Sequence, residues 1–86
     1  MAKAFNLTII NPTKTVYEGK VISAVVPAAL GYLGILANHA PLAANLVSGK
    51  IILQEEYGAR KVFYHRSRGF LEILKNKVTI ILNQNE

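Results

Sequence analysis

The feature that most constrains the fold is a series of short segments in which apolar and polar residues alternate. The first of them, FNLTII, places Phe5, Leu7 and Ile9 on one side of an extended chain. Such alternation in β-favouring residues is typical of a half-buried strand. Because no segment keeps a 3.6-residue apolar period over about three turns, the chain is predicted to be all-β.

Further strands follow from the same pattern, and turn residues separate them. Four are predicted at residues 15–17, 20–26, 33–36 and 42–47. Glu18-Gly19 is expected to stop the first of these, and Pro27 the second. Two hairpins complete the set, residues 49–56 with 60–66 and residues 70–74 with 78–82. Some eight to ten short strands predict one sandwich or barrel domain over residues 1–86.

Composition excludes several classes of protein. The chain has no cysteine, which excludes disulfide scaffolds and thiolate metal sites. Its residues are 51% hydrophobic and 17% charged, which excludes a disordered charged tail. No run approaches the ~20 apolar residues of a membrane helix, and the N-terminus lacks the pattern of a signal peptide. We therefore expect a soluble domain without a secretion signal.

Residues that could support catalysis or bind a metal are sparse. The chain contains no aspartate, and the adjacent Glu55 and Glu56 should point to opposite faces of a strand. His39 and His65 show no metal-ligand spacing. We therefore expect no catalytic residue, no metal site and no cofactor. His39 is interpreted as a loop histidine that hydrogen-bonds to the backbone.

The strongest charge feature is the segment RKVFYHRSR, residues 60–68, in a chain of formal net charge +5. Basic residues interleaved with aromatics can follow a nucleic-acid backbone and stack on its bases. On a strand, however, neither face of this segment would be uniformly basic. Two interpretations remain, a basic β-barrel that binds single-stranded nucleic acid and a strand with one partly buried face and solvated basic ends. The second is favoured.

The segment GYLGILANHAPLAANLVSGK, residues 31–50, is too broken for a helix and too apolar for a free linker. Gly31 and Gly34 are expected to allow backbone conformations that other residues resist. An exposed apolar patch on a small domain usually marks an interface. The larger apolar residues are expected mostly in the core: Leu33, Ile35, Leu36 and Leu46. Tyr32, His39 and Ala44 are the better candidates for an interacting surface.

The same segment carries a resemblance to a known family. Its motifs GYLGIL and NHAPL, followed by Leu46 and Gly49, resemble the signature of the epsilon subunit of F-type ATP synthases, which is called delta in mitochondria. The flanking motifs agree: VYEG at residues 16–19, GFLEI at residues 69–73 and VTIIL at residues 78–82. The resemblance covers essentially the whole chain, with the motifs in the family's order.

The resemblance implies a fold and a role. The fold is the N-terminal β-sandwich of epsilon, with about ten strands in two sheets. The role is that of a rotor subunit in the central stalk of a proton-translocating ATP synthase, without catalysis of its own. It would link the gamma subunit to the polar loops of the c ring, and indirectly to the alpha/beta hexamer. It would lie at the cytoplasmic face of the bacterial plasma membrane, bound only through the complex and not to nucleic acid.

The resemblance also implies two sets of interface residues. The c-ring contact would comprise Gly31, Tyr32, Leu33 and His39. The gamma contact would comprise Asn11, Pro41 and Ala44.

This chain departs from the family pattern at three places. Tyr32 stands where many members have an acidic residue that faces a basic c-ring loop. Arg66 replaces a usually apolar residue, and Arg68 a usual glycine, which indicates either altered local packing or a different neighbour there. Finally, the two-helix C-terminal hairpin of most members is not expected in this chain, so inhibition or nucleotide binding by that hairpin is not assigned.

Overall fold

The structure is a computed structural model that describes residues 3–84, and these residues form strands, turns and links without a helix. Accordingly, the described part of the chain contains no helix long and apolar enough to cross a membrane. The strands are β1 (Phe5–Ile10), β2 (Thr15–Ala28), β3 (Gly31–Leu36), β4 (Leu42–Leu46), β5 (Gly49–Glu55), β6 (Arg60–His65), β7 (Gly69–Leu74) and β8 (Lys77–Leu82).

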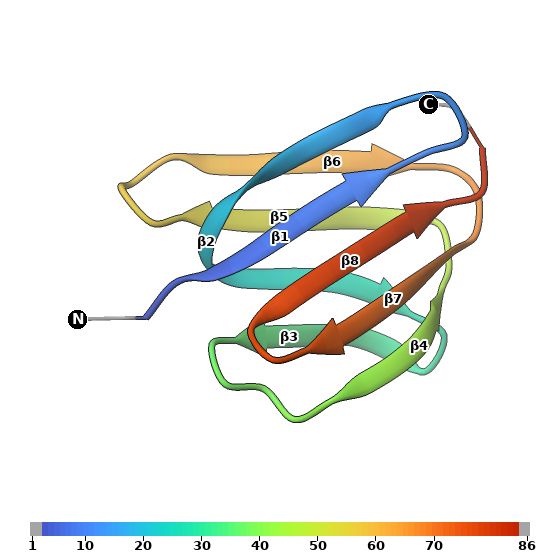
Figure 1. Cartoon of the computed structure of the whole chain (residues 1–86). Coiled ribbons are helices and arrows are strands. Elements are labelled where there is room, and N and C mark those ends of the chain that lie inside the picture. Colours follow the sequence, from blue (N-terminus) through green and yellow to red (C-terminus); the bar gives the residue numbers. More distant parts are fainter. Residues whose placement is uncertain (1–2, 85–86) are drawn as a thin grey trace.

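These eight strands pack as a two-layered sandwich (Figure 1). One layer contains β1, β8, β7 and β4, with β1 and β8 running parallel to each other. The other contains β3, β5 and β6, joined through β2. Because β2 pairs with β1 at one end and with β3 and β5 at the other, it belongs to both layers.

The long strand β2 is continuous, although the sequence predicted a break at Glu18-Gly19 and an end at Pro27. That expectation was wrong because β1 pairs with β2 through these residues, with Glu18 opposite Thr8 and Gly19 opposite Leu7. The register instead shifts between Val21 and Ser23, where β2 passes from one layer to the other. Pro27 lies inside the strand, and its carbonyl accepts a hydrogen bond of 2.9 Å from the Val47 amide.

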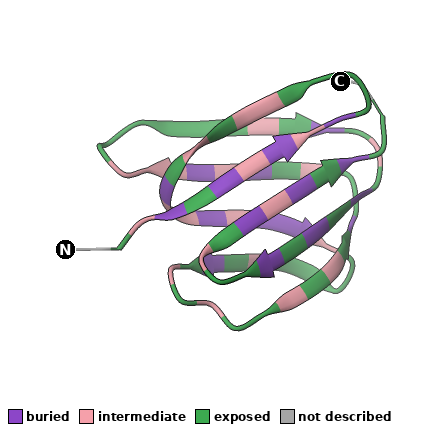
Figure 2. Cartoon of the chain, in the orientation of Figure 1, coloured by how far each residue is buried: buried purple, intermediate pink, exposed green. Residues whose placement is uncertain are grey.

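Alternating residues of the strands fill the space between the layers. Strand β7 shows the pattern without exception, buried at Gly69, Leu71 and Ile73 and exposed between them (Figure 2). The buried hydrophobic residues form one cluster: Phe5, Leu7, Ile9, Val21, Ala24, Val26, Ile35, Leu46, Ile51, Leu53, Leu71, Ile73, Val78, Ile80 and Leu82. The prediction of an all-β sandwich is therefore confirmed, with eight strands rather than about ten.

Both predicted hairpins are present. Strands β7 and β8 are joined by a two-residue turn in which Lys75 and Asn76 have positive φ values of 51° and 58°. Positive φ at both central residues matches the right-handed twist of the flanking strands. Strands β5 and β6 are joined by a longer loop, in which Gly58 adopts a φ of 104°. The two hairpins fix which residues of neighbouring strands lie side by side.

Candidate functional site

The turn between β2 and β3 is the most exposed apolar point of the described chain. Ala28 pairs with Gly31, which leaves a two-residue turn whose Leu30 side chain is fully exposed. Gly31 has a φ of 128°, so the conformational freedom predicted for it is used. Gly34 has no such φ and lies within β3, so the same prediction for Gly34 was wrong.

An apolar hollow of about 400 Å³ lies beside this turn, between the edges of β3 and β4. Strand β4 pairs with β2 only through Leu46 and Ala28, so the layers part here and leave the space open. Most of its lining is apolar and comes from the turn, β3 and β4: Ala28, Ala29, Leu30, Gly31, Tyr32, Leu33, Leu42, Ala44 and Asn45. We call this space the apolar hollow. An exposed concavity lined in this way fits an apolar side chain of a partner protein.

The apolar hollow brings together residues that the sequence assigned to two different contacts. Gly31, Tyr32 and Leu33 were predicted to meet one partner, and Ala44 another. All four line the same space, because β3 and β4 enclose it from two sides. The predicted contacts therefore adjoin, and a side chain placed in the hollow would touch members of both sets.

His39 and Pro41 lie elsewhere, in the link between β3 and β4. Strand β3 has six residues and spans about 20 Å, so this link is at the opposite end of β3 from Gly31. Asn38 fastens the link to the β7–β8 turn through two hydrogen bonds with Asn76, of 2.5 and 3.0 Å. The His39 Nδ1 lies 2.7 Å from the Ala40 carbonyl oxygen, to which it can donate a hydrogen bond. His39 is thus the loop histidine that the sequence predicted.

Asn11 is buried and shapes the β1–β2 turn. Its side-chain oxygen accepts hydrogen bonds from the Thr13 amide at 3.0 Å, the Thr13 hydroxyl at 3.2 Å and the Lys14 amide at 3.0 Å. With its oxygen engaged in this way, Asn11 would support a contact by setting the shape of the turn.

The predicted core residues divide between core and surface. Ile35 and Leu46 are buried, and Leu33 packs partly against the core, as expected. Leu36 points outward and is exposed, so its assignment to the core was wrong. It follows Ile35 on the same strand, and successive side chains point to opposite faces.

A second hollow, of about 590 Å³, adjoins the first at the end of the sandwich where β5 starts and β6 ends. It is lined by Tyr32, Ser48, Gly49, Lys50, Tyr64, His65 and Arg66. We call it the basic hollow. Tyr32 lines both hollows and therefore divides them. Its hydroxyl oxygen accepts a hydrogen bond of 3.3 Å from the Lys50 amide, which fixes the ring against β5.

Gly49 belongs to this site, although the sequence analysis named it only as part of the family signature and not among the contact residues. It has a φ of 156°, and a Cβ atom added there would lie 2.9 Å from both the Pro27 Cβ and the Tyr32 hydroxyl oxygen. No other residue would fit without moving Tyr32. Besides that signature, the sequence signal was the Ser48-Gly49 pair at the start of a predicted strand, which favours a turn.

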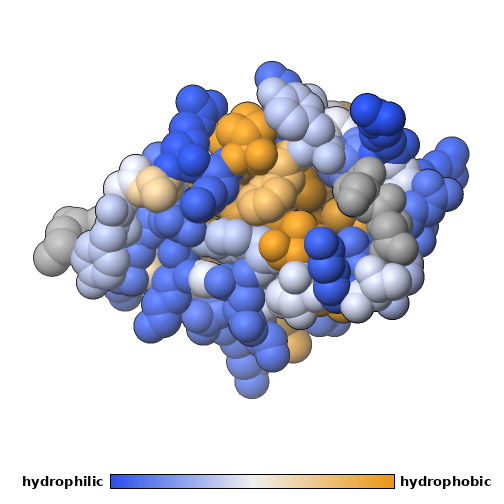
Figure 3. Space-filling view, turned by 90° about the horizontal axis from the view of Figure 1, so that it is seen from above, coloured by the Kyte–Doolittle hydropathy of each residue, from blue (hydrophilic) through white to orange (hydrophobic). Residues whose placement is uncertain are grey.

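Side-chain contacts close the upper edge of the sandwich, where β6 faces the first half of β2 without pairing to it (Figure 1). The Tyr17 and Phe63 rings meet edge to face, with centroids 5.7 Å apart. The Tyr17 hydroxyl donates a hydrogen bond of 2.5 Å to the Glu55 carboxylate. Seen from above, hydrophobic side chains remain visible within a hydrophilic rim (Figure 3). The edge is therefore closed by side chains, not by a backbone ladder.

Tyr17 should titrate at an unusually high pH. Burial, then the hydrogen bond to Glu55 and the charge of Glu55, raise the pKa of Tyr17 from 10.0 to about 12. Between these two pH values the folded state keeps a proton that the unfolded state loses, so the free energy of unfolding falls as pH rises. We expect phenolate absorbance of the folded chain to show a late component that Tyr17→Phe removes.

The exposed Tyr57 supplies the control for this titration. Tyr57→Phe should leave the late component in place, since the Tyr57 side chain is exposed and takes no part in the Tyr17–Glu55 hydrogen bond. A late component that persists in Tyr17→Phe would contradict the assignment to Tyr17.

The basic segment at residues 60–68 does not form a stacking surface. Phe63 turns inward against the core and Tyr17, and His65 is buried, so Tyr64 is the aromatic side chain of this segment that is well exposed. Arg60 and Arg66 lie at opposite ends of β6. The favoured interpretation, a strand with one partly buried face and solvated basic ends, agrees with this arrangement. Among residues 3–84, moreover, no group of three or more His, Asp or Glu side chains could hold a metal ion.

Comparisons with known proteins identify the family. A sequence model described as "ATP synthase, Delta/Epsilon chain, beta-sandwich domain" matches residues 4–86. The ATP synthase epsilon chain of Dichelobacter nodosus is 42% identical over 82 residues, which are 95% of this chain and 56% of that relative. The epsilon chain of Leptospira borgpetersenii is 40% identical over 80 residues, 93% of this chain and 61% of that relative. The chain thus spans about six-tenths of the length of these curated relatives.

Two solved structures share the fold. A chain of the Euglena gracilis mitochondrial ATP synthase, in a structure of OSCP, F1 and c ring, superimposes with a TM-score of 0.83 at 21% identity. That match covers 95% of this chain and 51% of the other. A chain from the central stalk and c ring of the Tetrahymena thermophila enzyme gives 0.75 at 16% identity, covering 92% and 63%.

At such low identities these structures show the fold alone, whereas the sequence matches show the family. The family match runs from residue 4 to residue 86 and so passes through all eight strands of the sandwich. The chain belongs to the family of ATP synthase delta/epsilon chains, whose β-sandwich domain it forms.

Proposed function

We propose that this chain works in the central stalk of a proton-translocating F-type ATP synthase. It links the gamma subunit to the polar loops of the c ring and thereby couples ring rotation to ATP synthesis in the alpha/beta hexamer. It catalyses nothing by itself and needs no cofactor. It lies at the cytoplasmic face of the bacterial plasma membrane and is held there only through the complex.

The observation that carries this proposal is the family match through every strand of the sandwich. Relatives that are 42% and 40% identical to the chain carry the name ATP synthase epsilon chain. A match confined to one motif would support a common ancestor only, whereas this match includes the turn, links and hairpins that shape both hollows.

The geometry supports two adjoining contacts. The apolar hollow, with Ala44 in its wall, suits an apolar side chain of gamma, and the basic hollow beyond Tyr32 suits the c ring. Gly31 and Leu33 are assigned to the ring together with Tyr32, although both line the apolar hollow, so the ring contact would reach the rim of that hollow. Asn11 and Pro41 are assigned to gamma and His39 to the ring. Asn11 would act from the β1–β2 turn, and His39 and Pro41 from the β3–β4 link.

Direct binding tests this proposal. We expect the chain to bind purified gamma subunit by isothermal titration calorimetry, and to bind detergent-solubilised c ring immobilised on a sensor. We also expect gamma and ring to be held at the same time, because the two hollows are separate spaces. Circular dichroism establishes that the chain is folded. A folded chain that binds neither gamma nor the ring would contradict the proposal.

A further inference from the structure

Strand β3 forms the lower edge of its layer, because it pairs with β2 on one side and with no described strand on the other (Figure 1). Pro27 of β2 shows which backbone groups face that edge. Its carbonyl accepts the hydrogen bond from the Val47 amide, so the backbone of Pro27 faces away from β3. In an antiparallel ladder its partner Tyr32 then lies in a non-hydrogen-bonded pair, and the Tyr32 amide and carbonyl point to the free edge. Gly34 and Leu36 follow at alternate positions, so their amides and carbonyls point the same way.

This edge lacks the features that usually keep a strand from pairing with another chain. Protected edges carry charged residues, a proline, a bulge or a covering segment. Strand β3 is GYLGIL, without charge or proline, and it pairs with β2 in an unbroken register. No hydrogen bond between described residues engages its edge-facing backbone groups. By contrast, β6 at the upper edge of the same layer carries Arg60 and Lys61, and the Tyr17–Phe63 contact covers it.

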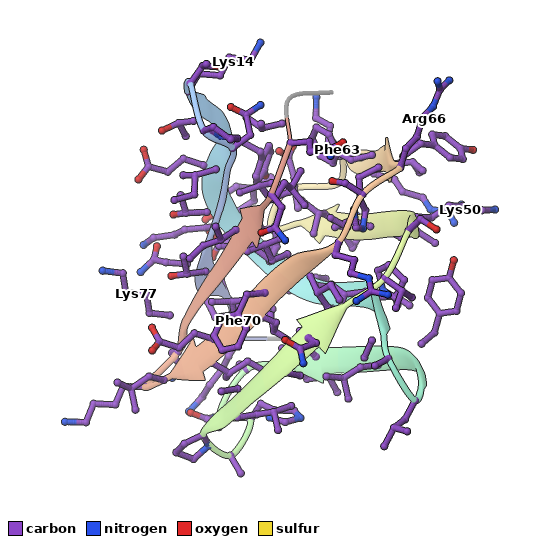
Figure 4. The ribbon with its side chains drawn as sticks, turned by 90° about the vertical axis from the view of Figure 1, so that its right-hand side faces the viewer. Lys14, Lys50, Phe63, Arg66, Phe70 and Lys77 are labelled. Carbon is purple, nitrogen blue, oxygen red and sulfur yellow. The ribbon has the colours of Figure 1, made fainter. Side chains whose placement is uncertain are left out.

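The surroundings of β3 also lack charge. Residues 21–49 contain no Lys, Arg, Asp or Glu, and they supply β3, β4 and the second half of β2. Lys50 and Lys77 project to opposite sides of the molecule and away from β3 (Figure 4). Lys75 lies in the β7–β8 turn, which Asn76 fastens to the β3–β4 link but which belongs to the other layer. Because salt screens the remaining charges over about 8 Å at physiological ionic strength, the net charge of +5 does not keep two copies apart at this edge.

We propose that β3 pairs with β3 of a second copy of this chain, antiparallel and about a two-fold axis at Gly34. In this register Tyr32 lies opposite the partner's Leu36, and Gly34 lies opposite the partner's Gly34. Residues opposite each other in this way exchange two backbone hydrogen bonds, so every edge-facing group of β3 is engaged. Any shift along the strand leaves at least one of these residues without a counterpart. The layers that contain β3 then form one continuous sheet through both copies.

The side chains support the same register. Tyr32 and Leu36 both point to the outer face of the layer, where they are 60% and 64% exposed. The Tyr32 hydroxyl is held at the Lys50 amide, so the partner's Leu36 meets the ring from its exposed side. Aromatic and aliphatic residues that face each other across two strands stabilise a sheet. A second copy is the occupant because one strand supplies both members of this pair, whereas an unrelated strand would have to bring its own.

Gly34 gains a role from this pairing. It has no positive φ, so the glycine is not explained by its backbone conformation. A glycine inside a strand often marks a place where another backbone approaches closely. A Cβ atom added to Gly34 would meet no heavy atom within 4 Å, so the single chain itself leaves this space open. In the dimer, the backbone of the second copy would approach at this point.

Pairing through β3 has a consequence for the unassembled chain. It would bury Tyr32, so a paired copy could not offer this side chain to any other partner at the same time. A chain that uses Tyr32 in a larger complex would therefore enter that complex as a single copy. The dimer itself does not depend on the proposed function, and its test requires no other subunit.

Sedimentation velocity of the full chain tests the dimer. We expect the average mass to rise from 9.4 kDa, the mass of one chain, towards twice that value between about 10 μM and 1 mM. The association should be weak, because an interface built on one pair of strands is small. A folded chain that stays at 9.4 kDa throughout would overturn the proposal. If Gly34→Pro then abolished the binding of purified gamma by such a monomeric chain, the edge would belong to a strand of gamma instead.

Two substitutions at Gly34 block the pairing without touching the buried face of β3. Gly34→Pro removes an edge-facing amide, and proline is tolerated on an edge strand when its nitrogen faces solvent. Gly34→Lys places like charges opposite each other at the two-fold axis. We expect each to raise the dissociation constant of the dimer roughly tenfold or more. Urea midpoints check the fold, and Gly34→Lys remains informative if Gly34→Pro is destabilised.

The matched control is Ala59→Lys, which adds the same charge at an exposed position in the β5–β6 loop. We expect this control to associate like the wild type. If Gly34→Lys and Gly34→Pro associate as strongly as the control, the dimer forms through another surface and the proposal is wrong.

Paired charges test the register. Tyr32→Lys with Leu36→Lys should abolish the dimer, because each introduced charge faces a like charge of the partner. Tyr32→Glu with Leu36→Lys should associate at least tenfold more strongly than that variant, because opposite charges then face each other across the two strands. Equal association of the two double variants would overturn the proposed antiparallel register about Gly34.

Discussion

Leu71→Ala should remove a large part of the stability of this domain, by about 2–5 kcal/mol in the free energy of unfolding. Leu71 has no exposed surface and lies in the middle of β7, between Ala44 on β4 and Ile80 on β8. Its removal leaves a cavity that neighbours on several strands border. A domain of this size has a total stability of about 5–10 kcal/mol, so the urea midpoint should fall by about a fifth or more.

Leu74→Ala on the same strand is the control for this prediction. Leu74 faces outward and is 47% exposed, so the same substitution should cost about 0.5 kcal/mol or less. The two positions lie on opposite faces of β7, Leu71 in its middle and Leu74 at its last residue. Equal losses at Leu71 and Leu74 would contradict the assignment of β7 as a strand with one buried and one solvated face.

The alternation that makes Leu71 a core residue is visible in the sequence, and here the prediction was sound. Strand β7 pairs over all of its residues with β8, and buried and exposed residues alternate from Gly69 to Leu74. The Lys75-Asn76 turn is local chemistry, since both residues need only adopt positive φ. Where neighbours along the chain decide the structure, as in this hairpin, sequence patterns suffice.

Strand β2 shows where such patterns fail. Glu18 and Gly19 are poor strand residues by propensity, yet they pair with Thr8 and Leu7 of β1 and so stay in the ladder. Partners distant in the sequence therefore override local preference. The open space beside Ala44 has the same origin, because it depends on how little β4 pairs with β2. The sequences of β3 and β4 do not indicate how far apart these two strands lie.

The candidate site was predictable only in part for a related reason. The motif at residues 31–42 suggested one surface, but β3 separates Gly31 from His39 by its full length. In contrast, Lys50 and Tyr64 meet because the β5–β6 hairpin pairs them directly. That hairpin was predicted, so the meeting of a lysine with a tyrosine could have been read from its register. The contribution of Tyr32 could not, because it comes from a different hairpin.

Ala44→Arg should weaken binding to gamma about 100-fold or more, which corresponds to a loss of about 3 kcal/mol in the free energy of binding. Ala44 is a small residue in the wall of the apolar hollow, facing Leu33 and Tyr32 across that space. An arginine there would occupy the hollow and bring a charge into an interface that offers it no carboxylate in the lining. Titration calorimetry with purified gamma measures the loss.

Ala59→Arg provides the matched control, because Ala59 is exposed in the β5–β6 loop at the far end of the sandwich. It introduces the same side chain and charge, and gamma binding should stay within about twofold of the wild type. Urea midpoints establish that both variants are folded. Binding to the c ring separates the two contacts, because Ala44→Arg should spare it. Loss of both partners in a folded Ala44→Arg chain would mean that gamma and ring share the apolar hollow, and that Tyr32 does not divide two contacts.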